Sequence, residues 1–303
     1  MFSKTKRTIL THRSKGEKIA YGFVFFMFCL YTLSLMLPFV FLAFNSLKGG
    51  EEYLSSVQAG KTFFPPVKAI WKNYVDAFKA MKVTDFNQRE IFFPEMFFNS
   101  IWYTVLYVGM GVIASSITAY IVAKYRFRFR RVIDGIAIFT MTIPIVGTTA
   151  SSMSMYNALG IYNTPLLPIL TGFGGFGFNF LILRGFFANL PWSYAESVFV
   201  DGGGHFTVFT KIMMPQALPC LVTLFIMAFI GTWNDYQTLL LYMPSYPTIS
   251  SGLYLVQRSL TRHPLEYPVY FAGLMVSIVP VIVMFGLFSN IIMSNFTVGG
   301  LKG

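Results

Sequence analysis

Residues 190–219 read LPWSYAESVFVDGGGHFTVFTKIMMPQALP, a polar interlude between two long apolar segments. The pattern predicts a short helix over residues 194–201, a sharp turn at the glycine triplet 202–204, and a second short helix over residues 205–214. Pro215 is expected to end that second helix, because proline has no N–H to donate and its ring obstructs the preceding turn. The stretch therefore predicts a helix–turn–helix on one face of the molecule, and such an element is first of all a docking surface.

The composition around this stretch is that of an integral membrane protein. The 303-residue chain is 55% hydrophobic and 12% charged, whereas a soluble domain carries about twice that share of charged residues. The net charge of +11 does not indicate nucleic-acid binding, because the basic residues gather beside apolar runs, as do the five between Lys124 and Arg131. That arrangement orients a protein in a membrane and meets lipid headgroups.

Apolar runs long enough to cross a bilayer occur six times along the chain. The sequence predicts an all-α integral membrane fold, one domain over residues 1–303, with spans at about 19–44, 97–123, 132–151, 165–187, 218–243 and 269–293. The basic cluster after the second run places that end in the cytosol, so both termini and the helix–turn–helix loop at 190–216 are expected there. The long loop at 45–94 is then on the outer side.

Two of the predicted spans contain residues that disturb a regular helix. The third contains Pro144, which is expected to break it. The fourth has a glycine-rich centre at residues 172–178. Small residues allow helices to approach closely in lipid, so packing is the favoured interpretation of this centre. A hinge, or the smooth wall of a translocation path, would also need glycine.

The spacing inside residues 190–216 resembles the signature cytoplasmic loop of ABC-importer permeases. That signature reads Glu-Ala-Ala, three residues, Gly, nine residues, Ile, one residue, Leu-Pro. The matching positions hold Glu196, Gly202, Ile212 and Pro215. The chain departs from the signature at three positions, where Ser197 and Val198 replace the two alanines and Met214 replaces the leucine.

Flanking pieces extend the resemblance over roughly the last two thirds of the chain. Residues 179–187 are similar to the approach to this loop in carbohydrate permeases, and Trp233–Asp235 to a Trp-Asn pair after it. The ending Gly299–Gly303 is similar to the tail of maltodextrin-transporter permeases, specifically of the second, six-span member of the pair.

The resemblance implies a role as one permease subunit of an ATP-driven importer for a carbohydrate, expected to be an oligosaccharide. It implies a multi-pass protein of the bacterial cytoplasmic membrane, paired as a heterodimer with a second permease, with two ATPase subunits and an extracytoplasmic solute-binding protein. ATP and Mg would be bound by the ATPase subunits, and this chain would hold no cofactor. The residues implied in ATPase coupling are Glu196, Ser197, Asp201, Gly202, Gly203, Ile212 and Pro215.

The outer loop at 45–94 has two interpretations on this basis. Trp71–Tyr74 predicts short helices that cap the outer face. These helices would either contact the solute-binding protein or form a solvated lid with no specific partner.

The sequence offers no catalytic constellation of its own. Gly60-Lys61-Thr62 is the only tripeptide of the phosphate-loop type, and position 55, where the first glycine of that loop would stand, holds Ser55. The three histidines fall in separate segments and predict no metal site. The chain is therefore not expected to be an enzyme, and an integral-membrane enzyme is the weakest alternative.

Polar side chains inside apolar spans are candidates for a substrate path. They are Asn179 in the fourth span and Trp233, Asn234, Asp235 and Tyr236 in the fifth. Aromatic stacking combined with hydrogen bonds suits a sugar, but Asn and Asp also hydrogen-bond between helices in lipid. The alternative function is an ion-coupled secondary transporter. It is disfavoured because such carriers need carboxylates at mid-membrane, and the spans hold mainly Asp134 and Asp235.

Overall fold

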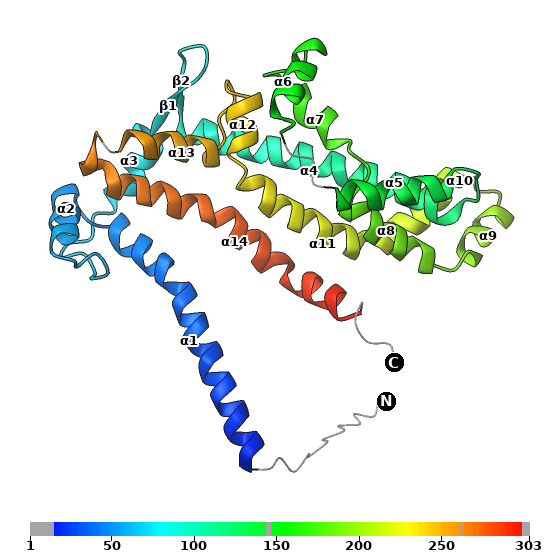
Figure 1. The fold of residues 1–303 in the computed structure, drawn as a ribbon, viewed down its shortest axis with the longest axis horizontal. Coiled ribbons are helices and arrows are strands. Elements are labelled where there is room, and N and C mark those ends of the chain that lie inside the picture. The colour runs from blue at the N-terminus through cyan, green and yellow to red at the C-terminus, as the bar shows by residue number, and fades with distance from the viewer. Residues whose placement is uncertain (1–14, 144–146, 261, 299–303) are drawn as a thin grey trace.

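Long helices lying side by side form the body of the molecule (Figure 1). The computed structural model describes residues 15–143, 147–260 and 262–298, so the basic N-terminal segment, Pro144 and the Gly299–Gly303 tail lie outside the described residues. The central helices are α4 (Phe93–Lys124), α11 (Met214–Trp233) and α14 (Tyr267–Val298). Helix α11 packs between α4 and α14.

Four helices in the described ranges are long and apolar enough to cross a membrane. They are Gly16–Ser46, Phe93–Lys124, His205–Trp233 and Tyr267–Asn290. They coincide with the predicted first, second, fifth and sixth spans. The regular secondary structure of the described part of the chain is helical apart from one small hairpin, which confirms the predicted helical class.

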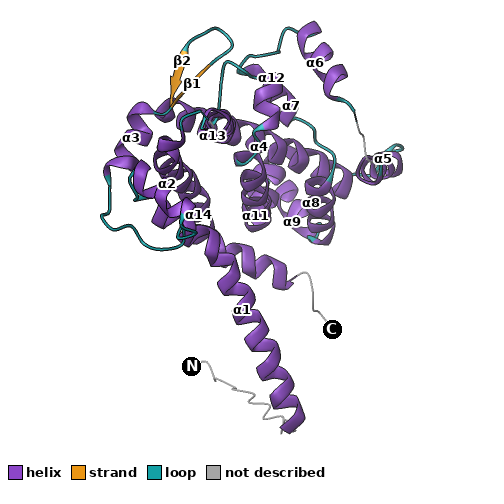
Figure 2. Ribbon diagram, turned by 60° about the vertical axis from the view of Figure 1, so that its left-hand side comes forward, coloured by secondary structure: helices purple, strands orange, loops and turns teal. Residues whose placement is uncertain are grey.

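Helix α1 (Lys15–Ser46) extends away from the rest of the body and packs on α14 at one end (Figure 2). Its side chains are exposed along most of its length, for example Phe25 at 70% and Leu33 at 63%. Apolar surface on this scale is not stable in water, so lipid or another subunit must cover it.

The predicted third span at 132–151 corresponds to α5 (Arg130–Thr142), whereas α6 (Thr149–Ala158) lies mostly in the segment that follows that span. The predicted fourth span at 165–187 is divided into α7 (Leu166–Gly172) and α8 (Phe178–Asn189). The predicted fourth span is therefore not one continuous helix. The chain is non-helical between α7 and α8, where Gly177 adopts φ +127°, a conformation that favours glycine.

The glycines of this break also pack closely on α4, as the sequence predicted. A Cβ on Gly172 would lie 2.7 Å from the Tyr107 carbonyl oxygen, and one on Gly175 would lie 3.4 Å from the Ala114 carbonyl oxygen. The Thr118 hydroxyl donates a hydrogen bond to the Gly175 carbonyl at 3.1 Å. The break is thus held in place against the middle of α4.

Short elements gather at one end of the bundle (Figure 1). They are α2 (Gly50–Gln58), α3 (Lys72–Ala80), β1 (Lys82–Thr84), β2 (Glu90–Phe92), α13 (Ile249–Ser259) and the 3-10 turn η2 (Pro264–Glu266). Helix α3 confirms the short helix predicted near Trp71–Tyr74. The hairpin was not predicted: β1 and β2 pair antiparallel, with Val83 opposite Ile91. Asp85 closes its turn by accepting hydrogen bonds from the backbone N–H groups of Asn87 and Arg89.

A buried lysine anchors this end to α1. Lys48 is 1% exposed, and its ammonium donates to Asn45 Oδ1, Ser56 Oγ and the Thr62 carbonyl at 3.0–3.3 Å. Desolvation lowers the pKa of this ammonium, and the nearby Glu52 carboxylate partly offsets the shift. Three acceptors match its three N–H donors, which makes a buried cation tolerable without an ion pair.

Candidate coupling and transport sites

The predicted turn at residues 202–204 is present and has the geometry of a Schellman motif. Helix α9 (Ser193–Val200) ends at Asp201, and Gly202 follows with φ +80°. The Gly203 N–H donates to the Val198 carbonyl at 2.8 Å, and the Gly202 N–H donates to the Phe199 carbonyl at 3.1 Å. These two bonds satisfy carbonyls that the helix end leaves unpaired. The glycine at position 202 is therefore required by backbone conformation.

The prediction that Pro215 ends the second short helix is wrong. The helix begins with α10 (His205–Thr207), continues as a π-helix, η1 (Val208–Met213), and runs on into α11. Pro215 occupies the first turn of α11. A π-turn is wider than an α-turn, so it accommodates the ring and the missing N–H that would break a regular helix. The loop's second helix and the following apolar helix are therefore continuous.

The helix–turn–helix is fixed to the end of α4. The Lys124 ammonium donates a hydrogen bond to the Leu190 carbonyl, and the Tyr125 hydroxyl lies 2.8 Å from His205 Nδ1. Ala195 of α9 and Val208 of η1 are fully buried in a core shared with α4 and α8. Both arms of the turn are thus packed on the same support.

The opposite face of the helix–turn–helix is open to solvent. It carries Glu196 and Asp201, together with two large apolar side chains, Val200 at 87% exposure and Phe206 at 78%. Within the described residues the Glu196 carboxylate has no ion-pair partner. Sequence reasoning missed Val200 and Phe206, although their apolar character beside the glycine triplet was a usable signal.

The other residues predicted to take part in coupling make contacts within the helix–turn–helix itself. The Ser197 hydroxyl donates to the Ser193 carbonyl one turn earlier, at 3.0 Å. Ile212 lies half-buried in the π-helix. Gly203 packs so closely that a Cβ there would lie 2.5 Å from Val198 Cγ1.

A second polar site lies where α11 ends and α12 (Gln237–Tyr242) begins. Asp235 Oδ1 accepts a hydrogen bond from the Thr238 N–H at 3.1 Å, which caps the first turn of α12. Asn234 is exposed, and its side-chain amide donates to the Ile230 carbonyl. The ring of Tyr236 stacks on Tyr254 at 4.7 Å.

Trp233 differs from its neighbours because it is 3% exposed. Its ring stacks on Phe229 at 5.5 Å, and its indole N–H donates to the Ser277 carbonyl of α14 at 3.1 Å. These contacts place Trp233 in the packed core between α11 and α14.

Asn179 lies at the start of α8, directly after the glycine break. It lines a cavity beside α4 that none of residues 233–236 reaches. The structure therefore separates the five predicted path residues into two places.

A partly buried ion pair joins α5 and α8. Arg184 of α8 meets the Asp134 carboxylate of α5 through two nitrogens, Nε and an Nη. Two such contacts give the pair the bidentate geometry in which arginine recognises a carboxylate.

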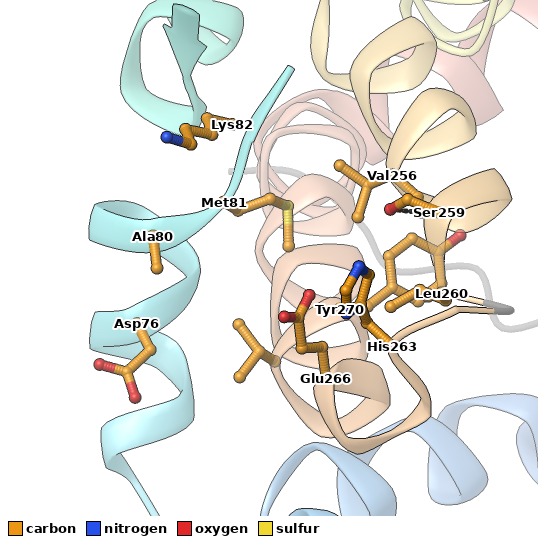
Figure 3. Close-up of a pocket in the computed structure, with 11 residues that line it drawn as sticks. Asp76, Ala80, Met81, Lys82, Val256, Ser259, Leu260, His263, Glu266 and Tyr270 are labelled. Atoms are coloured by element: carbon orange, nitrogen blue, oxygen red, sulfur yellow. Dashed lines mark hydrogen bonds between the residues drawn. The ribbon is translucent and has the colours of Figure 1, made fainter. Parts of the chain in front are cut away.

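A cavity of about 480 Å³ opens at the end of the bundle that carries the short elements. Figure 3 shows Asp76 of α3 on one wall and Glu266 and His263 on the facing wall. Lys82 also lines it, but its ammonium is paired with Glu90 at 2.5 Å. Asp76 and Glu266 have no ion-pair partner within the described ranges, so this outer pocket is acidic in an otherwise basic chain.

Comparisons with known proteins connect this geometry to transport. The family described as "Binding-protein-dependent transport system inner membrane component" matches residues 111–296. The sulfoquinovosyl glycerol transport system permease protein of Agrobacterium fabrum is 26% identical over 88% of this chain and 89% of its own length. The maltodextrin transport system permease protein of Bacillus subtilis is 29% identical over 67% of this chain and 75% of its own length.

The fold itself has a close counterpart among solved structures. A chain in the crystal structure of a bacterial ABC transporter involved in the import of the acidic polysaccharide alginate superposes with a TM-score of 0.73. The match covers 92% of this chain and 98% of that one, at 24% identity.

Proposed function

Because this chain belongs to the family of inner membrane components of binding-protein-dependent transport systems, we propose that it is a permease subunit of an ATP-driven carbohydrate importer. The permeases to which it is similar serve sulfoquinovosyl glycerol and maltodextrin transport, and further relatives serve diacetylchitobiose and trehalose uptake. A carbohydrate is the cargo class that these names share, and maltodextrin, diacetylchitobiose and trehalose each contain two or more sugar units, so we expect an oligosaccharide. The assembly contains a second permease, two ATPase subunits that bind ATP and Mg, and an extracytoplasmic solute-binding protein.

One observation carries the coupling role: the docking arm is continuous with an apolar helix. His205 to Trp233 form one uninterrupted helical path, and His205 at its start is hydrogen-bonded to Tyr125 at the end of α4. A force applied to the exposed face of the helix–turn–helix is therefore delivered to α4 and α11 without a flexible joint. This face would sit in a groove of one ATPase subunit and follow that groove when ATP closes the ATPase pair.

Glu196 and the apolar pair give this face its means of attachment. The Glu196 carboxylate offers a charge-assisted hydrogen bond to a basic residue of the ATPase. Val200 and Phe206 offer apolar area that is exposed in the isolated chain, and such area is typical of an interface. Gly202 and Gly203 give the turn its shape, and Pro215 sets where the π-turn meets α11.

The substrate path is assigned to the polar residues that remain accessible. Asn179, Asn234, Asp235 and Tyr236 keep polar or aromatic groups outside the packed core. Trp233 does not line this path but packs beside it, because its ring is buried against Phe229.

The ion-coupled alternative finds no support. Asp134 is neutralised by Arg184, and Asp235 caps a helix. Neither carboxylate is left free to bind a coupling ion in the way that a secondary transporter requires.

The test is uptake by the complete assembly in proteoliposomes with ATP inside. We expect sugar uptake to require ATP and to persist without an ion gradient. Glu196→Lys is expected to leave ATP hydrolysis running while uptake falls. Glu51→Lys, an exposed acid on α2, is the control and should transport normally. Normal uptake by Glu196→Lys would remove the coupling assignment.

A further inference from the structure

A cavity of about 260 Å³ lies between α4, the break that joins α7 to α8, and α11. Its walls include Gly111, which stands near the middle of the 32-residue helix α4. The cavity therefore lies at mid-depth of the bundle. Close backbone packing shapes it, since a Cβ on Gly111 would lie 3.3 Å from the Gly172 carbonyl oxygen.

Three polar side chains on the walls of this cavity have no hydrogen-bond partner within the described residues. Ser115 is 3% exposed, lines the cavity, and its hydroxyl makes no hydrogen bond within the described residues. The side-chain amide of Asn179 and the hydroxyl of Tyr107 also make none in the described part of the chain. Helix α8 starts at the cavity, and its N-cap, Gly177, supplies no side-chain cap to the first N–H groups.

This arrangement does not suit contact with lipid. Non-helical backbone at membrane depth is tolerated only where protein covers it or where it lines a water-filled space. A buried hydroxyl without a partner is likewise costly unless water or a ligand reaches it. The cavity is therefore expected to hold water or a polar ligand and to open toward the interior of the assembly.

The chemistry of the walls selects a class of ligand. Hydroxyl, amide and helix N-terminal groups bind the hydroxyls and ring oxygen of a sugar, and the half-exposed rings of Phe176 and Phe178 at the cavity offer faces for its C–H groups. None of the lining residues is charged. The walls therefore offer no cationic side chain that could pair with an anion.

We propose that this cavity, with Ser115, Asn179 and Tyr107, is a subsite for one uncharged sugar ring on the translocation path. The proposal rests on the proposed carbohydrate function and adds a site and a ligand class to it. Its volume is smaller than that of typical pockets for larger ligands, which are about 300–1,000 Å³. A single ring of the cargo therefore fits, with the rest of the cargo in the partner's half of the path.

The experiment measures access to Ser115 in the complete assembly. Cys29 and Cys220 are replaced by alanine, and Ser115→Cys is reacted with a water-soluble thiol reagent. The control is Ser116→Cys, because Ser116 is fully buried and its hydroxyl donates to the Val112 carbonyl of its own helix. We expect the cysteine at 115 to react and the one at 116 not to react. Asn179→Cys gives a second reporter if the first variant does not fold.

Sugars are then added as probes: glucose, maltose and glucuronate. We expect glucose or maltose, at about four times its dissociation constant, to slow the reaction at position 115 by about fivefold, because an occupied site cannot react, and glucuronate not to slow it. An unreactive cysteine at both 115 and 179 would overturn the cavity as a wet site. Protection by glucuronate alone would overturn the uncharged class.

Failure of the importer proposal can be distinguished from failure of the subsite proposal. If the assembly takes up no sugar with ATP, the importer proposal fails, whatever the labelling shows. If it takes up maltose but maltose protects neither position, the subsite fails and the importer proposal stands.

Discussion

Gly202 and Gly203 have different physical roles in one turn. Gly202 is needed for its backbone angle, φ +80°, which side chains rarely adopt. Gly203 is needed for space, because the Val198 side chain and carbonyl oxygen lie 2.5 and 3.0 Å from the point where its Cβ would stand. Gly204 has nothing within 4 Å of that point. The three consecutive glycines therefore differ: position 202 needs glycine for its backbone angle, position 203 needs it for space, and position 204 is open to solvent.

This difference predicts the effect of Gly203→Ala. The added methyl group overpacks the turn at a cost of about 1–3 kcal/mol, so we expect ATP-driven uptake to fall severalfold while the amount of protein in the membrane stays near normal. Gly204→Ala is the matched control and should keep uptake. Equal activity of the two variants would mean that the turn's geometry does not matter for coupling.

Lys48 predicts a stability effect in the outer loop. Lys48→Met leaves the acceptor Asn45 Oδ1 without its buried donor, at about 1–3 kcal/mol for an unsatisfied group, while the Thr62 carbonyl keeps the hydrogen bond that the Asn45 side-chain amide donates. We expect a lower melting temperature in detergent and faster proteolysis within residues 45–94. Lys61→Met, an exposed lysine of the same loop, should behave as the unsubstituted protein. An unchanged melting temperature for Lys48→Met would remove the anchor role.

The pKa of Lys48 also predicts a pH dependence. Desolvation lowers the pKa of the folded ammonium below that of the unfolded chain, so the folded state releases its proton first. The contribution of Lys48 to the free energy of unfolding is therefore constant at neutral pH. It rises as the pH increases from the lowered pKa toward about 10.4, the pKa of an unperturbed lysine. Thermal melts across that window should show the rise in the unsubstituted protein and not in Lys48→Met. A parallel rise in both proteins would assign it to another group.

At the scale of elements, the helix from His205 to Trp233 is the connection between docking face and membrane. The sequence predicted both arms of the helix–turn–helix and its turn, because helix punctuation by glycine is local. It did not predict passage through Pro215, because a π-turn depends on packing that holds the wider geometry in place. Val208 and Met213, which bracket that π-turn, are both fully buried.

The exposed apolar pair on this element predicts a binding effect. Val200→Ser combined with Phe206→Ser removes apolar area worth about 1.5–3 kcal/mol for each side chain if both are buried in the complex. We expect the ATPase subunit to dissociate at least about tenfold more readily, as measured by binding of the purified ATPase to the permease in nanodiscs. Val67→Ser makes the same kind of apolar-to-polar change at a 95% exposed position of the outer loop, and it should leave ATPase binding unchanged. Unweakened binding would show that the pair lies outside the interface.

Other elements show where sequence reasoning reaches its limit. The glycines of the break were expected to serve packing, and Gly172 and Gly175 do so, but Gly177 has open space around it and serves the interruption of the helix between α7 and α8. The hairpin at residues 82–92 was not predicted, because each of its strands is only three residues long. The burial of Trp233 depends on α14, a helix more than thirty residues later in the chain, so nothing in its local sequence distinguishes it from the accessible Tyr236.

At the scale of the whole molecule, the two functional ends lie at opposite ends of the bundle (Figure 1). The helix–turn–helix occupies one end, and the acidic outer pocket with α3 and α13 occupies the other. This separation matches a transporter in which an ATPase acts from the cytosol and a binding protein delivers cargo outside. Helix α1, with its exposed apolar surface, is the described element that most needs lipid or a second permease beside it.

The outer pocket predicts how the binding protein approaches. Asp76→Asn with Glu266→Gln removes two unpaired negative charges from one cavity. We expect the association rate of the binding protein to fall by about tenfold at low salt, with less effect at high salt. Stopped-flow association with the reconstituted assembly measures this, and Glu51→Gln is the control. An unchanged rate at low salt would favour a solvated lid without a specific partner.

This chain is expected to work only as one part of an importer. Affinity purification of the tagged chain from native membranes in mild detergent, with quantitative mass spectrometry of the proteins that accompany it, tests this directly. We expect an ATPase subunit and a second membrane-spanning permease in comparable amounts, with the ATPase reduced in the Val200→Ser, Phe206→Ser variant. Recovery of the folded chain alone would show that it does not work as an importer subunit.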